Sequence, residues 1–303
     1  MFPANNKKPC EIVRRAFFYY HIFYYKSGYS YLETIRDIVV CFMLQKIVNL
    51  HKQSYSMAAT KLRIEFDVLW KNIIERFIEE FVEFFMPDLY PKINFDETPV
   101  FKDKELDKIF GDGKSKDVRR CDKLVQLHLK DGQKCWILVH IEVQKKLNNT
   151  LPKRMFRYFY RIFDRYEEQS EGIEAIAILL NKVAENKYNT YSYKYGKTII
   201  KYNYRTYELF AAGENELIEN KNPFSIVILA SRYALKYKDN EKKKASFKYK
   251  LARLAFERNY DKQRIVQLLY FIYFVITLAD EQTETKLEEE IILKLNTMEP
   301  RPI

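Results

Sequence analysis

The sequence predicts an α/β fold in which helices flank a mixed β-sheet, followed by an α-helical C-terminal extension. Apolar residues recur at three- and four-residue spacing over 66–85, which is typical of an amphipathic helix. Two apolar segments, 121–129 and 135–144, flank a short loop with glycine, which indicates a β-hairpin. The segments then run helix, strand, strand, helix, strand, strand before a helical tail, an order that favours a mixed sheet.

Composition restricts the class of protein. The chain has 303 residues, of which 47% are hydrophobic and 31% charged, so we expect a globular protein rather than a disordered one. The net charge of +11 favours polyanionic partners such as nucleic acid, although a merely basic soluble protein would share it. The cysteines follow no metal-ligand spacing and indicate reduced thiols in a cytoplasmic protein; they are Cys10, Cys41, Cys121 and Cys135.

No segment predicts a membrane span. The uncharged run from Ile265 to Ala279 has 15 residues, whereas a span needs about 20, so we expect a buried core helix there. The N-terminal RRAFFYYHIFYYK resembles the apolar part of a signal peptide but has no small-residue cleavage site.

Three regions are expected along the chain. Residues 1–56 are irregular and aromatic-rich, with a helix expected from about Tyr31 to Asn49. Met57 is followed by two alanines and resembles a natural start, so we hypothesise that it is the initiator and that 1–56 is not translated. The α/β domain is expected over 57–212 and the helical extension over 213–303.

The elements of the α/β domain follow from local patterns. The first helix carries an apolar face and ends at Pro87; that face comprises Phe66, Leu69, Ile73, Phe77, Phe81 and Phe84. A linker over 87–117 precedes the hairpin, and a further helix is expected from about Leu151 to Glu168. The later segments are a buried strand at 173–180, one or two strands within 197–210, and three or four helices within 223–297, where Asn222-Pro223 suits a capped helix start.

Two carboxylates fall on the predicted hairpin, and its register decides whether they meet. If the loop is 130–132 with Gly132 in a left-handed conformation, Asp122 faces His140 across the pair. Glu142 is then the diagonal neighbour of Asp122 on the same face, and Gln144 follows at the strand period of two. A two-residue loop would instead put Glu142 on the opposite face.

Neighbouring carboxylates repel unless a cation lies between them. Their oxygen atoms suit Mg²⁺ or Mn²⁺, which also bind substrate phosphates and activate water. Asp122, Glu142 and Gln144 in a basic protein therefore suggest metal-dependent phosphodiester hydrolysis. The alternative is that the carboxylates form ion pairs with Arg119, Arg120 or Lys123.

These segments resemble the PD-(D/E)XK nuclease superfamily, specifically its bacterial recombination-promoting nuclease and transposase group. The resemblance covers about Phe66 to the C-terminus, and it is carried mainly by RRCDKLVQLHLKDGQKCWILVHIEVQ (119–144) and RMFRYFYRIFDRY (154–166). Similar stretches are FDVLWKNIIERFIEEFVEFFMPDLYPKINF (66–95), FKDKEL (101–106) and NPFSIVILA (222–230).

The resemblance implies a PD-(D/E)XK (restriction-endonuclease-like) core and roles for particular residues. Asp122 and Glu142 would hold the metal, and the Val143 carbonyl would complete the site. Gln144 stands where the superfamily usually has lysine; it can orient water but carries no charge, so catalysis would depend more on the metal or on Lys145 or Lys146. The superfamily also has an acid on its first helix, for which spacing does not select among Glu75, Glu79, Glu80 and Glu105.

The helix at 154–166 divides into two sides. Four arginines share one side and suit phosphate contacts; they are Arg154, Arg157, Arg161 and Arg165. The apolar side should pack on the sheet, with Met155, Phe156, Phe159, Ile162, Phe163 and Tyr166. The basic run 236–250 is interpreted as a solvated helix face or loop, with nucleic-acid contact as the alternative, and His128 and His140 as structural histidines.

The predicted function is a Mg²⁺-dependent DNA endonuclease, linked by the resemblance to recombination or transposition. DNA is the expected partner, and a homodimer is a further expectation. A nuclease-fold module that binds nucleic acid without turnover is the alternative, supported by Gln144. An interaction protein that binds DNA only through its net charge is the third interpretation.

Overall fold

A computed structural model describes residues 66–102, 122–142, 151–169, 172–180, 189–258 and 260–297. All of them belong to one compact unit, Glu65–Ile303. The N-terminal segment 1–56, the helix expected at 31–49, and Met57 lie outside these residues. The described residues therefore belong to the predicted α/β domain and its helical extension.

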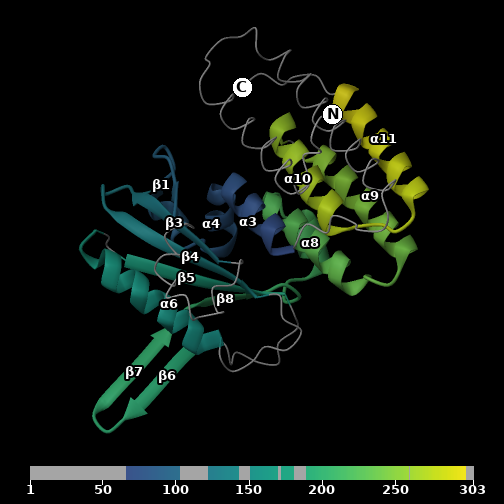
Figure 1. The fold of residues 1–303 in the computed structure, drawn as a ribbon. Coiled ribbons are helices and arrows are strands. Elements are labelled where there is room, and N and C mark those ends of the chain that lie inside the picture. Colours follow the sequence, from purple (N-terminus) through teal and green to yellow (C-terminus); the bar gives the residue numbers. More distant parts are fainter. Residues whose placement is uncertain are drawn as a thin grey trace, which may run out of the picture. The chain divides into compact units, whose positions relative to one another are not determined.

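The described strands form a mixed sheet (Figure 1) with the order β1-β3-β4-β5-β8, in which β2 also pairs with β3. Strands β3 and β4 are antiparallel, whereas β4 pairs in parallel with β5, and β5 with β8. The predicted mixed α/β architecture is confirmed. The strands are β1 (Ile93–Asn94), β2 (Val100–Phe101), β3 (Asp122–Leu129), β4 (Lys134–Glu142), β5 (Gly172–Leu179) and β8 (Arg205–Glu208).

Helix α6 (Leu151–Tyr166) connects the parallel strands β4 and β5. Parallel neighbours require such a crossover, because a tight turn can join only antiparallel strands. The helix packs on one face of the sheet, against Leu124 of β3 and Ala175, Ala177 and Leu179 of β5. The predicted helix at 151–168 is confirmed, with its last residues in the 3₁₀ turn η2 (Glu167–Gln169).

The predicted first helix is two helices, α3 (Phe66–Arg76) and α4 (Ile78–Phe85). They separate at Phe77, whose φ of −127° and ψ of 44° are not helical. The predicted apolar face is nevertheless largely buried, with Leu69, Ile73, Phe77 and Phe81 each 3% exposed or less. The short strands β1 and β2 and the 3₁₀ turn η1 (Tyr90–Lys92) occupy the start of the region predicted as a linker.

The helical extension packs on α3 and α4. The indole Nε1 of Trp70 in α3 donates to the Ser231 hydroxyl at 3.1 Å, and the rings of Phe81 and Phe224 meet at 5.3 Å. Asn222 caps α8 by accepting from the Phe224 N–H, and Pro223 is the first helical residue, as predicted. The extension comprises α7 (Glu214–Glu219), α8 (Pro223–Lys236), α9 (Glu241–Glu257), α10 (Lys262–Val275) and α11 (Glu281–Thr297).

Helix α10 contains most of the apolar run at 265–279, and it is a core helix, as predicted. Ile265, Leu268 and Ile272 are almost wholly buried. Within the described part of the chain, no helix is both long and apolar enough to cross a membrane.

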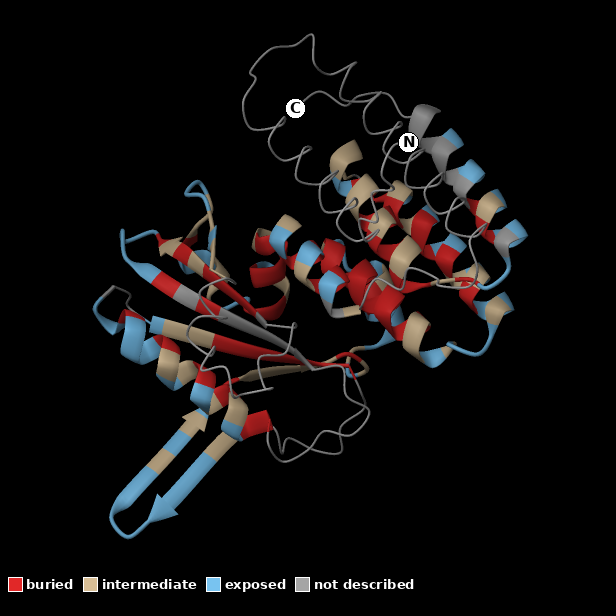
Figure 2. Cartoon of the chain, viewed as in Figure 1, coloured by how far each residue is buried: buried red, intermediate tan, exposed pale blue. Residues whose placement is uncertain are grey.

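Strands β6 (Thr190–Tyr195) and β7 (Thr198–Asn203) form a separate antiparallel hairpin outside the main sheet. Only its second strand falls within the strands predicted at 197–210. Figure 2 shows that much of this hairpin is exposed, in contrast to the buried interior of the main sheet.

Candidate metal and nucleic-acid site

The β3–β4 hairpin has the register predicted from its loop. The Leu129 N–H donates to the Gln133 carbonyl at 2.8 Å, and Gly132 has a φ of +87°, in the left-handed region. Asp122 consequently pairs with His140. The three-residue loop predicted at 130–132 is therefore confirmed.

This register places Asp122 and Glu142 at diagonal positions on the same face of the sheet. The Cβ atoms of diagonal neighbours lie roughly 7–8 Å apart or less, within reach of long side chains. The side chains of Asp122, His140 and Glu142 lie outside the described part of the structure. Val143, Gln144, Lys145 and Lys146 lie outside it entirely, as do Arg119 and Arg120, two of the three alternative partners of the carboxylates. The third, Lys123, pairs with Glu75.

Two carboxylates at these positions fit a hard divalent cation. Mg²⁺ and Mn²⁺ take oxygen ligands, and Mg²⁺ commonly binds one or two protein carboxylates while keeping waters or phosphate oxygens in its other positions. Among the side chains that the structure describes, no group of three or more His, Cys, Asp and Glu is arranged to hold a metal. The fit therefore rests on the strand register and on the chemistry of the two donors.

Helix α6 covers the sheet face that carries these two positions. Leu124 follows Asp122 at the strand period of two and is buried against α6. Glu142 pairs in register with Leu179 of β5, which belongs to the same apolar cluster. The arginine-bearing helix and the two carboxylate positions thus share one side of the sheet.

The opposite face of β3 carries an ion pair between Lys123 and Glu75. Lys123 is 3% exposed, and its Nζ lies 2.7 Å from Glu75 Oε2 and 4.7 Å from the ring centre of Phe101. Since residues 122 and 123 point to opposite faces, Glu75 lies across the sheet from the Asp122 position. The contact supports a structural role for Glu75, one of the acids considered for the site.

The two neighbouring acids of α4 also have partners. Glu79 accepts a hydrogen bond from the Tyr90 hydroxyl at 3.0 Å, which raises the pKa of that tyrosine. Glu80 is buried, and its Oε1 lies 2.7 Å from Nη2 of Arg264. Burial raises the pKa of the Glu80 carboxyl despite this neighbouring cation. Glu105, the remaining acid, lies outside the described residues.

The four arginines of α6 differ in exposure. Arg157 and Arg165 are exposed, whereas Arg154 and Arg161 are partly buried. The guanidinium of Arg165 lies 5.7 Å from the ring centre of Tyr166. Arg157 and Arg165 are therefore the members of the predicted arginine side most accessible to a phosphate backbone.

The apolar side of α6 differs in part from the prediction. Tyr158 is buried with Met155, Ile162 and Tyr166, whereas Phe163, predicted to face the sheet, is 43% exposed. Phe156 and Phe159 contact the β6–β7 hairpin instead, with ring centres 4.8 Å from Tyr191 and 4.7 Å from Tyr202, respectively. The helix thus has a second packing partner that its own sequence pattern does not reveal.

The prediction that the basic run 236–250 is a solvated face is partly wrong. Lys248 is 1% exposed and donates to Glu284 Oε1 at 2.5 Å and to the Tyr273 carbonyl at 3.0 Å. Lys244 is also buried and donates to the Thr277 carbonyl at 2.8 Å. These lysines stabilise contacts among helices of the extension. His128, whose position pairs with Asn94 at the sheet edge, is partly buried.

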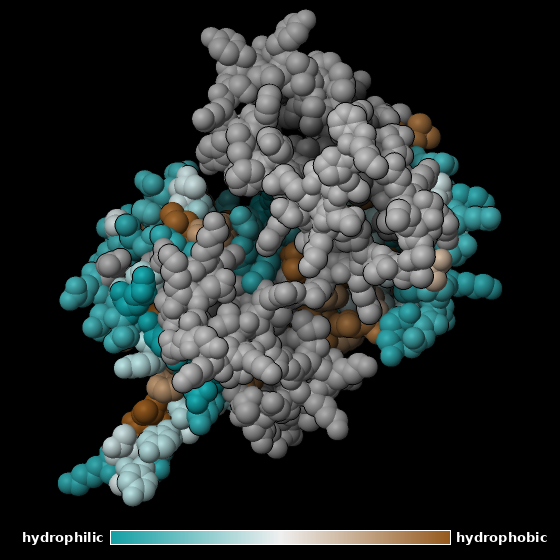
Figure 3. Space-filling model, in the orientation of Figure 1, coloured by the Kyte–Doolittle hydropathy of each residue, from teal (hydrophilic) through white to brown (hydrophobic). Residues whose placement is uncertain are grey.

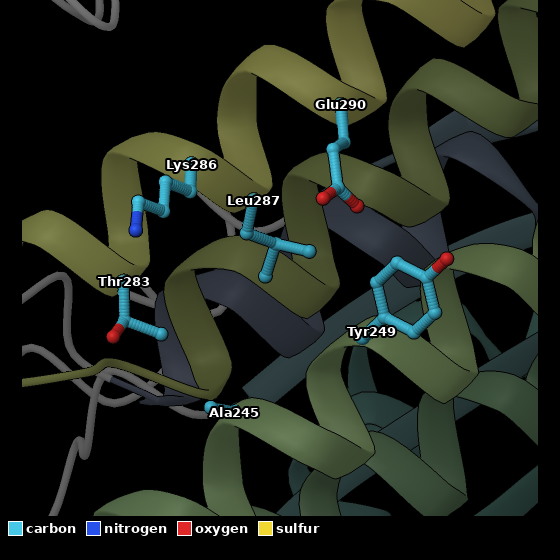
Figure 4. Close-up of a pocket in the computed structure, with 6 residues that line it drawn as sticks. All are labelled: Ala245, Tyr249, Thr283, Lys286, Leu287 and Glu290. Carbon is cyan, nitrogen blue, oxygen red and sulfur yellow. The ribbon is translucent and has the colours of Figure 1, made fainter.

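A pocket of about 270 Å³ lies between α9 and α11. Figure 4 shows Ala245 and Tyr249 coming from α9 and the remaining lining residues, including Lys286 and Glu290, from α11. None of the predicted site residues lines it. The pocket therefore does not add to the candidate site on the sheet.

One family model matches part of the chain. Residues 114–242 match the model of the family described as "Putative transposase, YhgA-like", which is of the PD-(D/E)XK nuclease type. The matched segment includes β3, β4, α6 and β5 and ends in α9, and the resemblance predicted from these residues is confirmed. No curated protein and no solved structure matched.

Proposed function

From the match of residues 114–242 to a transposase family of the PD-(D/E)XK type, we propose that the chain is a metal-dependent DNA endonuclease acting in recombination or transposition. The match itself supports a transposition-related function. The hydrolytic activity and the metal are the further steps of the proposal.

The observation that carries the proposal is the register of the β3–β4 hairpin. It brings Asp122 and Glu142, which are 20 positions apart in the sequence, to diagonal positions on one sheet face. The same face is covered by α6, whose exposed arginines suit phosphate oxygens. A basic protein with this arrangement combines a place for a divalent cation with a place for the DNA backbone.

Each residue has a proposed role. The Asp122 and Glu142 carboxylates hold Mg²⁺ or Mn²⁺, with the Val143 carbonyl as a further ligand. When bound, such a metal lowers the pKa of a coordinated water and stabilises the charge on the phosphate. The Gln144 amide orients the attacking water, and the arginine side of α6 positions the phosphate backbone; its members are Arg154, Arg157, Arg161 and Arg165.

A second candidate function is DNA binding without cleavage. Gln144 supports it, since an amide has no positive charge with which to stabilise the transition state. In this case the fold and the arginine side would be retained for binding. DNA affinity would then survive substitution of Asp122, and no metal-dependent cleavage would be seen.

The test is cleavage of supercoiled plasmid by the purified full chain with Mg²⁺ or Mn²⁺. Asp122→Asn and Glu142→Gln keep the side-chain shape and remove the metal-binding charge. Each should lower the nicking rate by at least about 100-fold, because loss of several kcal/mol of charge stabilisation costs tenfold for every ~1.4 kcal/mol. EDTA should abolish nicking by the parent.

A matched control is Asp131→Asn in the loop at the other end of the same hairpin. Asp131 accepts a hydrogen bond from the Gln133 N–H at 3.0 Å, which an asparagine oxygen can also accept, so nicking should be unchanged. Equal nicking by the parent and both site variants would refute the proposed ligands. DNA binding without nicking by any form would favour the second candidate.

A further inference from the structure

The β6–β7 hairpin exposes both aromatic and basic side chains. Tyr193 is 45% exposed, Tyr195 79% and Ile199 68%. Figure 3 shows mainly hydrophilic residues on the visible surface of its outer part. An isolated two-stranded hairpin is at best marginally stable in water, so this one needs an anchor and a reason for its exposure.

The anchor is α6. Tyr191 of β6 stacks on Phe156 with ring centres 4.8 Å apart and an interplanar angle of 16°, and Tyr202 of β7 stacks on Phe159 at 4.7 Å. Phe156 adjoins Arg157, one of the exposed arginines of α6. The base of the hairpin thus lies beside the helix proposed to contact phosphates.

The hairpin has two distinct faces, defined by its register. Tyr191 pairs with Tyr202 and Tyr193 with Ile200, so the tyrosines that stack on α6 continue outward as an aromatic face. Lys194 and Lys201 lie on the other face. Lys197 lies in the two-residue turn after Gly196, whose φ is +58°.

The charge of the hairpin has one sign. Residues 189–203 contain three lysines and no aspartate or glutamate, and all three lysines are exposed. The positive charge of these exposed lysines makes the hairpin complementary to a polyanion. Exposed tyrosines add flat side chains that can pack against sugars and bases.

We propose that the β6–β7 hairpin is a second DNA-contacting element, which enters a groove of a duplex held along α6. The inference rests on the proposed function, since it takes DNA as the occupant. Six-residue strands extend for about 20 Å, and the major groove, about 12 Å wide and 8.5 Å deep, admits a two-stranded ribbon. The lysines then contact phosphates at the groove edges, and Tyr195, next to the hairpin turn, reaches into the groove.

The same lysines have a simpler explanation. Lysine on an edge strand discourages pairing with other edges, and both strands of this hairpin are edges. That role does not involve DNA. The two explanations differ in the salt dependence of DNA affinity, because each phosphate contact contributes about 0.9 to the slope of log K against log salt.

The experiment measures binding of the full chain to a fluorescent 30-base-pair duplex in EDTA, where cleavage does not interfere, at several salt concentrations. The triple variant Lys194→Ala, Lys197→Ala, Lys201→Ala should bind more weakly, with a slope smaller in magnitude by about 2.7. A control triple variant, Lys221→Ala, Lys242→Ala, Lys250→Ala, removes the same charge from exposed positions on and near other helices and should keep the parental slope.

A second variant tests entry into the groove. Tyr195→Ala should weaken binding several-fold at every salt concentration with an unchanged slope, since it removes a neutral contact. Circular dichroism and the melting temperature of each variant should match those of the parent, because all the substituted side chains are exposed.

The outcomes separate this inference from the proposed function. Parental binding with the same slope in the hairpin and control triple variants would overturn the hairpin contact and leave the nuclease proposal intact. Failure of the parent to bind DNA would overturn the hairpin contact, whereas the nuclease proposal is decided separately by the plasmid-nicking test with metal. Increased self-association of the hairpin triple variant, with unchanged DNA affinity, would support the edge-protection role instead.

Discussion

At the scale of single residues, the buried Lys123 determines what Glu75 does. Lys123 is 3% exposed, and its Nζ lies 2.7 Å from Glu75 Oε2 on the face opposite the Asp122 position. A buried ammonium that loses a charged partner is destabilising, although the 43% exposure of the Glu75 side chain reduces the effect. Glu75 is therefore better explained as a structural partner than as a catalytic acid.

We expect Glu75→Gln to lower the free energy of unfolding by about 1–2 kcal/mol, measured by urea titration. Plasmid nicking at a temperature where the variant is folded should remain near the parental rate. Glu219→Gln, an exposed acid of α7, serves as the control and should change neither quantity. A Glu75 variant of parental stability that cannot nick DNA would instead identify Glu75 as part of the catalytic site.

The buried Glu80 predicts how the stability of the fold depends on pH. Burial raises the pKa of its carboxyl above the ordinary value of 4.5, and this outweighs the attraction of Arg264, whose side chain is 46% exposed and thus well solvated. The folded state therefore binds the proton more tightly than the unfolded state does. The resulting contribution to stability is fully present below pH 4.5 and is lost as the pH rises through the raised pKa.

Glu80→Gln removes this titration while keeping a neutral, hydrogen-bonding side chain. Relative to the parent, the variant should gain stability as the pH rises from about 4 to about 7, which urea titrations at several pH values can measure. If the two free energies of unfolding differ by a constant amount across this range, the pKa of Glu80 is not raised in the folded protein.

At the scale of elements, the three-residue loop sets the β3–β4 register. Gly132 has a φ of +87°, and a Cβ atom at this position would have no neighbour within 4 Å, so backbone conformation alone limits substitution there. We expect Gly132→Ala to lower the free energy of unfolding by about 1–2 kcal/mol, the cost of a left-handed L-residue. Gly172→Ala at the start of β5 is the matched control, because its surroundings are equally open and its φ is not positive.

Thermal or urea unfolding of the two glycine variants measures this difference directly. Equal stability of Gly132→Ala and Gly172→Ala would mean that the loop does not depend on the left-handed glycine. A parallel loss of plasmid nicking in Gly132→Ala alone would further connect the loop to the positions of Asp122 and Glu142.

Elements whose pattern is local could be predicted from the sequence. The β3–β4 register follows from Gly132 and the loop length, and the start of α8 follows from Asn222-Pro223. The two-residue strands β1 and β2 are too short to carry a period. Strand β6 alternates tyrosine with polar residues, a strand pattern that the prediction missed.

Contacts between distant segments could not be predicted in this way. Lys248 is buried because Glu284 and Tyr273 of other helices approach it, and nothing near Lys248 in the sequence shows this. The helical period wrongly predicts Phe163 on the sheet, and it does not show that Phe156 and Phe159 pack on the β6–β7 hairpin. For the candidate site, the sequence predicts the strand register that relates Asp122 to Glu142. That Glu75 of α3 packs against the opposite face of the sheet, beside Lys123, could be seen only in the structure.

At the scale of the whole described unit, α8 joins the C-terminal helices to α3 and α4. Phe224 is fully buried, and its ring lies 5.3 Å from Phe81, 5.5 Å from Phe85 and 6.5 Å from Trp70. Phe85 in turn contacts Tyr207 of the sheet strand β8 at 4.8 Å. The aromatic contacts thus run continuously from the C-terminal helices through α3 and α4 to the sheet.

We therefore expect the sheet and the helical extension to unfold together. Phe224→Ala should lower the free energy of unfolding by about 3–5 kcal/mol, the usual cost of removing a buried phenyl ring, whereas Phe163→Ala, at an exposed position, should cost less than about 1 kcal/mol.

Trp70 of α3 and Trp136 of β4 are the two tryptophans of the chain. The fluorescence of the Trp136→Phe protein therefore reports the helices through Trp70, and that of the Trp70→Phe protein reports the sheet through Trp136. In each background, Phe224→Ala should shift the urea midpoint, and fluorescence and far-UV circular dichroism should give the same midpoint. A sheet signal that keeps its midpoint while the helix signal loses stability would show that the extension unfolds independently, because the aromatic contacts would then not couple the two parts.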